Sequence, residues 1–392
     1  MADDRLRAYV LDVSYFSGKL EAYLRWKEIP YERIEVRWDR VQGELRRATG
    51  VAKVPVLRTA DGLWLQDTTP ILDWLEARHP HGAVLPDDSF QAFFCRLLED
   101  WADEWLWRPA LHYRWSYAPD ASLLSQRIAA EAMGHLPLPT ALAAAIVRRR
   151  QHRTYVSGDG VTRATRAHVE GIYLDTLERL ERLLREQPFL LGERPSLADF
   201  GLFGPMFRHF SLDPTPARLM RDRAPAVYEW VARLWNARAS RVGAGWPAPG
   251  ALPGVWRELL AEIGAGYLPA LHANAVAWRA GARRHGFTVQ GASYRDVPVV
   301  RYRVWCRERL QDHFEALPEA AKPAVRAELE RGGAWEPLWR DGRIASHLFD
   351  GAPPPVCPPA PGRRGLLGRL GDDPWNPAPR RAARGQPNEE MR

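Results

Sequence analysis

The chain has 392 residues, more than a single hydrophobic core usually supports, so two or three cooperating domains are expected. Its 55 basic and 48 acidic side chains give a net charge of +7 over a mixed surface, which argues against a nucleic-acid-binding protein. No apolar stretch is long enough to cross a bilayer, so a membrane is not an expected partner.

Cysteine usage also limits the class of protein. Cys95, Cys306 and Cys357 are widely spaced and form no CxxC or Cys/His cluster, which argues against a disulfide framework and a structural zinc site. We therefore expect no metal and a reducing compartment. The first residues run straight into a strand-like segment without the charged and apolar regions of a secretion signal, so a cytoplasmic location is expected.

Residues 1–80 switch repeatedly between strand and helix periodicity, in the order βαβαββα. The expected elements are strands at 8–13, 31–36, 54–57 and 63–65 and helices at 17–27, 39–48 and 68–78. The turn residues Asp61 and Gly62 join the last two strands as a hairpin, so the sheet should be mixed rather than wholly parallel. This order predicts an α/β domain with helices packed on the sheet.

Residues 88–242 carry apolar side chains at helical spacing and no convincing strand alternation, which predicts an all-helical bundle. Within it, Ser196 stands three residues before Asp199, just ahead of an apolar run. Ser196 can cap a helix N-terminus while Asp199 reaches back to the cap, so a helix should begin there.

A Gly/Pro-rich segment after Gly243 marks the next boundary, and residues 254–345 are predicted to form a mainly helical extension. We expect helices at 256–284, 299–317 and 320–331 and a short hairpin around the turn Gly291-Ala292. From 351 to 392 Pro, Gly and Arg dominate and apolar periodicity disappears, so this tail is expected to be disordered.

Four separated motifs, taken together, resemble the glutathione transferase family. The segment SYFSGK at residues 14–19 is similar to the "Cys-Pro-Phe-Cys-x-Arg" and "Ser-Ser-Cys-Ser-x-Arg" junctions of the omega and zeta classes. VPVL at 54–57 resembles the family's cis-proline strand, QDTTPILDWLE at 66–76 resembles its "Glu/Gln-Ser-x-x-Ile-x-x-Tyr-Leu-Glu" motif, and the Ser196/Asp199 box lies at its helix-capping position. The resemblance implies a thioredoxin-like domain that binds glutathione, followed by an all-helical domain.

The resemblance places thiol activation at residues 14–19. A free thiol has a pKa of about 8.5, and because only the thiolate attacks electrophiles well, such a site must stabilise the anion. Ser14 precedes a helix N-terminus, whose free N–H groups and dipole favour negative charge, and its hydroxyl would donate to the sulfur. Tyr15 and Ser17 are alternative donors, and Ser14 or Ser17 could instead only cap the helix. The absence of a cysteine at position 14 disfavours a redox protein that reduces disulfides.

The resemblance also assigns glutathione binding to Lys53, Val54, Pro55, Asp67 and Thr68. A cis peptide before Pro55 would aim the backbone of Val54 at the backbone of the ligand, although an ordinary edge-strand proline would fit the sequence too. Lys53 would meet the glycyl carboxylate or remain a solvated charge. Thr68 would bind the γ-glutamyl carboxylate at a helix N-terminus and Asp67 would pair with the α-ammonium, unless both residues only cap that helix.

A pocket for the second substrate is expected among the aromatic residues at the start of the helical domain. These residues are Trp101, Trp105, Trp107, Tyr113, Trp115 and Tyr117. Trp101 and Trp105 lie one helical turn apart and share a face, and with Tyr113 they are the main candidates. In relatives this helix borders the pocket, and aromatic rings would suit a flat apolar electrophile. The alternative is that the rings belong to the hydrophobic core.

The resemblance therefore implies a glutathione transferase-like detoxification enzyme with glutathione as its co-substrate. The thiol would attack a small apolar electrophile in conjugation, isomerisation or ether cleavage. The alternative is a non-catalytic binding or assembly module built on the same fold. Relatives usually dimerise through the two-domain body, so a homodimer is expected unless the extension alters or blocks that interface.

Overall fold

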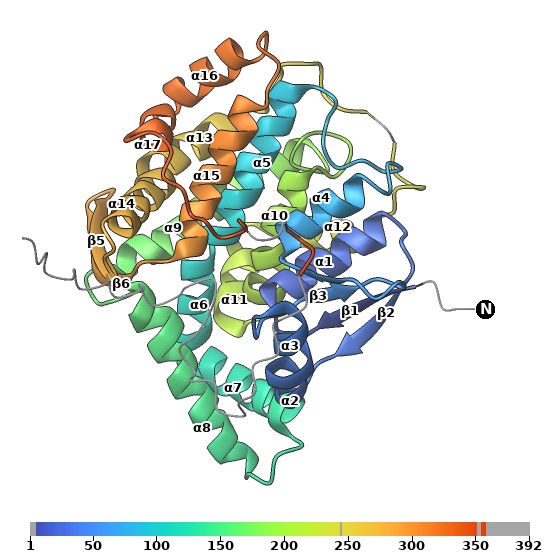
Figure 1. Cartoon of the computed structure of the whole chain (residues 1–392), viewed down its shortest axis with the longest axis vertical. Helices are drawn as coiled ribbons and strands as arrows, with labels where there is room; N and C mark the ends of the chain where they lie inside the picture. Colours follow the sequence, from blue (N-terminus) through green and yellow to red (C-terminus); the bar gives the residue numbers. More distant parts are fainter. Residues whose placement is uncertain (1–4, 244, 351–353, 358–392) are drawn as a thin grey trace, which may run out of the picture.

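The computed structural model describes residues 5–243, 245–350 and 354–357. A small α/β domain is followed by a helical domain and by a C-terminal extension that packs back onto the helical domain (Figure 1). The first two parts have the thioredoxin-like and all-helical architecture that the motifs predicted, so the fold prediction is confirmed.

The N-terminal domain is built around a four-stranded sheet. Its elements are β1 (Leu6–Val10), α1 (Tyr15–Trp26), β2 (Tyr31–Glu35), α2 (Trp38–Arg40), η1 (Val41–Leu45), α3 (Arg46–Thr49), β3 (Val56–Arg58), β4 (Trp64–Gln66) and α4 (Thr68–Glu76). The strand order is β2-β1-β3-β4, in which β2 runs parallel to β1 and β3 runs antiparallel to both of its neighbours. The sheet is therefore mixed, as the predicted hairpin requires.

The strand register brings three connections to one edge of this sheet. Tyr9, near the end of β1, lies opposite Val56 at the start of β3, and Val56 lies opposite Gln66 at the end of β4. The loop after β1, the residues before β3 and the residues after β4 therefore lie side by side. These connections, together with the first turns of α1 and α4, contain all the residues to which the sequence analysis assigned glutathione binding and thiol activation.

The second domain is helical, and its longest helices surround a buried apolar core. Its elements are α5 (Ser89–Glu104), α6 (Trp107–Ser116), α7 (Ala118–Met133), α8 (Thr140–Gln151), η2 (His152–Val156), η3 (Ser157–Asp159), α9 (Arg166–Glu186), α10 (Leu197–Pro205), η4 (Met206–Phe210), α11 (Pro214–Arg223) and α12 (Pro225–Asn236). At the start of α10, the Ser196 N–H donates to Asp199 Oδ2 at 2.8 Å, and the capping box is complete. The capping prediction is confirmed.

The extension continues the helical architecture and adds one hairpin. Its elements are α13 (Gly254–Glu262), η5 (Ile263–Tyr267), α14 (Leu268–Arg279), β5 (Arg284–Val289), β6 (Ala292–Pro298), α15 (Arg301–Glu315), α16 (Lys322–Arg331) and α17 (Trp335–Trp339). The short helix α17 was not predicted. α15 lies along α5 in the middle of the molecule (Figure 1).

Part of the expected disordered tail is corrected by the structure. Val356 forms a β-bridge with Leu65 of β4, so residues 354–357 are ordered against the sheet. They are held there because β4 is the last strand of the sheet and has an unpaired edge. Residues 351–353 and 358–392 of that prediction lie outside the described part of the chain.

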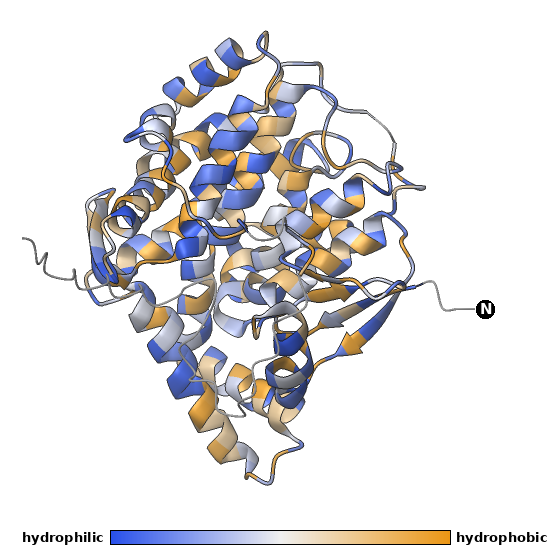
Figure 2. Ribbon diagram, in the orientation of Figure 1, coloured by the Kyte–Doolittle hydropathy of each residue, from blue (hydrophilic) through white to orange (hydrophobic). Residues whose placement is uncertain are grey.

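α15 is a mostly hydrophilic helix, as its colouring in Figure 2 shows, and yet seven of its 15 residues are buried. Its Arg309 is only 9% exposed, with Nη2 2.8 Å from Asp73 Oδ2 of α4 and Nη1 3.9 Å from Glu99 Oε2 of α5. Beside it, the Tyr267 hydroxyl donates to Asp100 Oδ2 at 2.6 Å. The extension therefore docks by supplying partners to buried carboxylates.

A buried ion cluster fixes the N-terminal domain against α5. Lys19 of α1 is fully buried, and its Nζ lies 2.5 Å from Glu99 Oε1, 2.5 Å from Asp103 Oδ2 and 3.3 Å from Thr69 Oγ1 of α4. Burial alone would lower the pKa of Lys19, but Asp103 and Glu99 outweigh burial and raise it, so the amine stays charged. One ammonium group thus joins α1, α4 and α5.

Replacement of Lys19 by Met should destabilise the chain strongly. The substitution keeps an unbranched side chain but leaves two buried carboxylates without their cation, which costs about 3 to 5 kcal/mol when one partner of a buried pair is removed. Urea unfolding of the full chain measures the change. Lys322→Met removes a lysine that pairs with Glu319 on the surface and should have a much smaller effect. Equal effects for the two variants would contradict a structural role for the Lys19 cluster.

Candidate active site

Ser14 stands at the N-terminus of α1, immediately after the loop that follows β1. Its backbone is extended, with φ −84° and ψ 126°, and its Oγ accepts a hydrogen bond from the Ser17 N–H at 3.3 Å. Ser14 therefore caps α1. This capping bond leaves the hydroxyl proton of Ser14 free to donate, because the Ser14 oxygen is the acceptor in it. Ser14 is half-buried, so its hydroxyl can still donate to an anion at the positive end of α1.

The other two candidate hydroxyls hold the local structure together. Ser17 is buried, and its Oγ accepts from the Leu11 N–H at 3.2 Å. Tyr15 is 1% exposed and its hydroxyl donates to the carbonyl of Ala102 in α5. Burial, reinforced by nearby carboxylates, raises the pKa of Tyr15 well above its ordinary value. Of the three candidates, only Ser14 combines partial exposure with a hydroxyl that is not bound into the interior.

The residues before β3 present backbone groups at the same edge of the sheet. The peptide between Val54 and Pro55 is cis, as the resemblance implied. Within the described residues, the N–H and C=O of the half-buried Val54 make no hydrogen bond, whereas the Pro55 carbonyl accepts from Gln66 Nε2 at 3.3 Å. Lys53 is exposed, and its positive charge lies close enough to Glu104 of α5 to favour the ionised carboxylate there.

Asp67 stands between β4 and α4 in a conformation that few residues other than glycine adopt. Its φ of 79° lies in the left-handed region, and its side chain makes no capping hydrogen bond to α4. Asp67 is 9% exposed and Thr68 is 3% exposed. The Asp67 carboxylate instead accepts from the Tyr302 hydroxyl of α15, with an Oδ2 to Oη distance of 2.8 Å. Burial raises the pKa of Asp67 to about 7, while Tyr302 and Lys19 favour the ionised form.

The aromatic residues expected to line a second-substrate pocket are mostly core. Trp101 is fully buried, and Tyr113 is 2% exposed and packs with Tyr117 and Tyr173. The burial of Trp101 and Tyr113 supports the core alternative. Trp105 lines a cavity of about 20 Å³ between α5, α14, β5 and α15. A space of this size holds a water molecule and not an organic electrophile.

Another group of rings includes Phe16, two residues after Ser14, and is only partly buried. Phe16 of α1 stacks on Trp107 of α6 with ring centroids 6.0 Å apart, and Trp107 contacts Tyr155 of η2 edge-on at 5.6 Å. We call these three residues the aromatic wall. Trp107 belonged to the predicted aromatic run, but Phe16 and Tyr155 were missed. The position of Phe16 two residues after Ser14 was the available signal, whereas Tyr155 reaches the wall only through tertiary packing.

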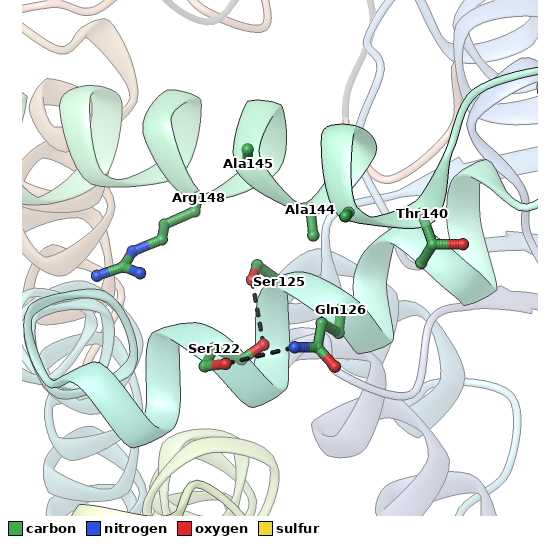
Figure 3. A pocket seen from close by; sticks show the side chains of 8 residues that line it. Ser122, Ser125, Gln126, Thr140, Ala144, Ala145 and Arg148 are labelled. Carbon is green, nitrogen blue, oxygen red and sulfur yellow. Dashed lines mark hydrogen bonds between the residues drawn. The ribbon is translucent and has the colours of Figure 1, made fainter.

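A larger hollow lies elsewhere, between α7 and α8. This groove has a volume of about 510 Å³ and is shown from close by in Figure 3. Its lining residues are Ser122, Ser125, Gln126, Thr140, Ala141, Ala144, Ala145 and Arg148. The lining contains hydroxyls, one amide and one guanidinium, and no carboxylate or imidazole that could act as a base near neutral pH. None of the residues expected to bind glutathione borders it.

Two family models match the chain. Residues 9–83 match the glutathione S-transferase N-terminal domain, and residues 163–233 match the glutathione S-transferase C-terminal domain. The first match includes the whole sheet edge described above, and the second includes the capping box of α10. Residues 9–83 and 163–233 therefore correspond to the two domains of the glutathione S-transferase family, and these matches support a glutathione-dependent, transferase-like role. No curated protein matches the chain.

Several solved structures are similar to this chain at low identity. The β-etherase LigF from Sphingobium sp. strain SYK-6 is 20% identical over 60% of this chain and 95% of that chain, with a TM-score of 0.42. A glutathione S-transferase from Rhodospirillum rubrum F11 is 21% identical over 64% of this chain and 97% of that chain, with a TM-score of 0.40. One from Methylobacterium radiotolerans JCM 2831, in complex with glutathione sulfonate, is 23% identical over 59% and 90%, with a TM-score of 0.37. With TM-scores below 0.5, these structures add nothing about the reaction of this chain.

No group of three or more His, Cys, Asp or Glu side chains among the described residues is arranged to hold a metal ion. No helix in the same part of the chain combines the length and the apolar character needed to cross a bilayer.

The buried carboxyls predict how stability depends on pH. Burial raises the pKa of Asp67 to about 7 and that of Glu104 to about 7, whereas an unfolded carboxyl titrates near ~4. The folded chain therefore holds more protons than the unfolded chain in this range, and its stability should fall as the pH rises through 7. Melting temperatures of the full chain measured between pH 6.5 and 8 test this.

A matched pair of variants tests whether the Asp67 carboxyl causes this fall of melting temperature with pH. Asp67→Asn keeps the shape of the side chain and removes its titration, so its melting temperature should fall less steeply with pH than that of the wild type. Asp87→Asn, at an exposed position, should keep the wild-type slope. A slope in Asp67→Asn equal to that of the wild type would show that the Asp67 carboxyl does not titrate in this range.

Proposed function

We propose that this chain is a glutathione transferase that activates the glutathione thiol at Ser14 and directs it at an apolar electrophile. The supporting observation is the meeting of three groups at one sheet edge. These groups are the hydroxyl of Ser14 at the N-terminus of α1, the backbone of Val54 beside the cis peptide, and the carboxylate of Asp67 before α4. Together they offer a partner to the thiol, the backbone and the α-ammonium group of one tripeptide.

In this proposal, glutathione binds through its two ends and its backbone. The γ-glutamyl α-ammonium pairs with Asp67, and the neighbouring carboxylate binds at the N-terminus of α4, where Thr68 supplies a hydroxyl and an N–H group. The cysteinyl backbone pairs with Val54, next to Pro55. Lys53 meets the glycyl carboxylate near the surface.

The chemical step needs a thiolate near neutral pH. The thiol proton leaves to solvent, and the sulfur anion is stabilised by a hydrogen bond from the Ser14 hydroxyl and by the positive end of α1. The thiolate then forms a carbon–sulfur bond with an electrophile held against the aromatic wall. In substitution and ether cleavage the displaced group leaves with its bonding electrons. In isomerisation the sulfur adds to a conjugated double bond, whose electrons move onto the conjugated group and return when the sulfur leaves again. Flat apolar molecules suit this wall best, because stacked and edge-on rings favour such surfaces. Conjugation, isomerisation and ether cleavage are all compatible with this step.

A non-catalytic glutathione-fold module is the second candidate function. One observation favours it: Asp67 and Thr68 are both buried, and the extension contacts Asp67 through Tyr302. Turnover separates the two candidates, because a binding or assembly module would not form a thioether. In either case we place the protein in a reducing, cytoplasmic compartment, which suits its three unpaired cysteines. A homodimer would have to use surfaces other than those parts of α4 and α5 that α15 contacts.

Replacement of Ser14 by Ala should raise the pKa of the bound thiol. One hydrogen bond to a charged group is worth about 1.5 to 3 kcal/mol, so turnover near pH 7 should fall at least tenfold. The KM for glutathione should change little, because the bond matters mainly for the anion. Ultraviolet absorbance of the bound thiolate as a function of pH, combined with conjugation kinetics, measures both effects, and higher pH should partly restore the rate.

Ser17→Ala and Tyr15→Phe are the matched controls. Each removes one hydroxyl from the same segment, and because both hydroxyls are bound into the interior, their loss should lower stability and leave the thiol pKa unchanged. If Ser14→Ala keeps its full rate and either control loses its rate, the hydroxyl of that control residue, Ser17 or Tyr15, is the donor to the thiol. A full rate in all three variants would assign activation to backbone N–H groups alone.

A further inference from the structure

The extension covers the part of the site that the proposed function assigns to the γ-glutamyl group. Tyr302 lies in the first turn of α15, and its hydroxyl is bonded to Asp67 Oδ2 at 2.8 Å. Asp67 and Thr68 are almost completely buried in this arrangement. An incoming α-ammonium group therefore has to displace atoms of the extension before it reaches the carboxylate.

A second contact covers the same connection from the side of the sheet. The Gln66 N–H donates to the Pro355 carbonyl at 3.0 Å, and the Cys357 N–H donates to the Trp64 carbonyl at 2.9 Å. The residues around Val356 thus pair with β4, the strand that ends next to Asp67. Because α15 and this segment are far apart in sequence, the extension reaches the γ-glutamyl position through two separate elements.

Ion pairs hold Tyr302 in this position. Arg309, about two turns further along α15, donates to Asp73 of α4 at 2.8 Å. Arg303, the residue after Tyr302, donates to Asp159 at 3.1 Å, and its Nε lies 3.8 Å from Glu104. Burying these charges is favourable only while the ion pairs stay intact, so α15 has one preferred packing position on α4 and α5. The contact between Tyr302 and Asp67 follows from this position.

We propose that Tyr302 competes with the ligand at the glutathione site, because its hydroxyl occupies the Asp67 oxygen that the α-ammonium of the ligand requires. This inference rests on the proposed function. A ligand with a free α-ammonium replaces a neutral hydroxyl by a charged donor, which makes the stronger hydrogen bond. Binding of the γ-glutamyl end therefore breaks the bond between Tyr302 and Asp67, and that bond lowers the affinity for glutathione. A thiol peptide without the amine leaves the bond in place and binds through its other groups.

Calorimetric titration of the full chain at pH 8 tests this inference, because the Asp67 carboxyl is mostly ionised at that pH. The probes are glutathione and its analogue with a glutaryl group, which lacks only the α-ammonium. Tyr302→Phe removes the competing hydroxyl and keeps the ring that contacts Trp305. It should bind glutathione about tenfold more tightly than the wild type does, since one hydrogen bond to a charged group is worth at least that factor. Its affinity for the glutaryl analogue should remain at the wild-type level.

Two further variants serve as controls. Tyr294→Phe removes a buried hydroxyl from β6, another part of the extension, where it contacts His168 of α9, and this variant should bind glutathione as the wild type does. In an Asp67→Asn background, Tyr302→Phe should no longer tighten binding as it does in the wild type, because an amide attracts the α-ammonium far less than a carboxylate does. Melting temperatures confirm that each variant is folded.

The outcomes separate the two proposals. Glutathione binding by the wild type with equal or weaker binding by Tyr302→Phe overturns the competing role of Tyr302 and leaves the proposed function in place. Binding by Tyr302→Phe alone supports both. Absence of glutathione binding in the wild type and in every variant overturns both the proposed function and the role of Tyr302, because the chain then has no glutathione site.

Discussion

The buried ammonium group of Lys19 is the interaction on which the geometry of the site depends. It touches Glu99 and Asp103 of α5 and the hydroxyl of Thr69 in α4, while its own backbone belongs to α1. Two of the three connections at the functional edge of the sheet lead directly into α1 and α4. Since a buried charge is stable only with its partners in place, the cluster allows little freedom in how these helices sit on α5. The positions of Ser14 and Asp67 follow from that restriction.

The same chemistry explains why a hydrophilic extension packs so closely. α5 directs a row of acidic side chains toward the extension, among them Glu99, Asp100 and Glu104. Each would be costly to bury alone, and the extension supplies arginines and a tyrosine hydroxyl as partners. The extension is therefore part of the packed interior of the protein. Its contact with Asp67 is one member of this series of polar contacts.

Sequence patterns predicted the parts of the fold and site that depend on local order. The strand-to-helix junction at Ser14, the proline after Val54 and the helix start at Thr68 each lie within a short motif, and the strand register brings them together. The capping box at Ser196 was equally local. Such features are readable because neighbouring residues determine them.

Contacts between distant segments were not readable from the sequence. Tyr302 lies 235 residues after Asp67, and nothing in the hydrophilic pattern of α15 indicates which carboxylates it meets. Periodicity likewise placed Trp101 and Trp105 on one face of a helix without showing whether substrate or core would cover that face. The aromatic wall includes Tyr155 only because η2 folds back against α6.

The central claim is that the sheet edge between Ser14 and Thr68 binds glutathione, and calorimetry with the doubly substituted chain Asp67→Ala/Thr68→Ala tests it most directly. Wild-type protein should bind one glutathione per chain. The double variant should bind about 30-fold more weakly, which corresponds to a loss of about 2 kcal/mol for the charge-assisted bonds at the γ-glutamyl end. Unchanged affinity in a folded double variant would contradict the account and place glutathione, if it binds at all, elsewhere on the protein.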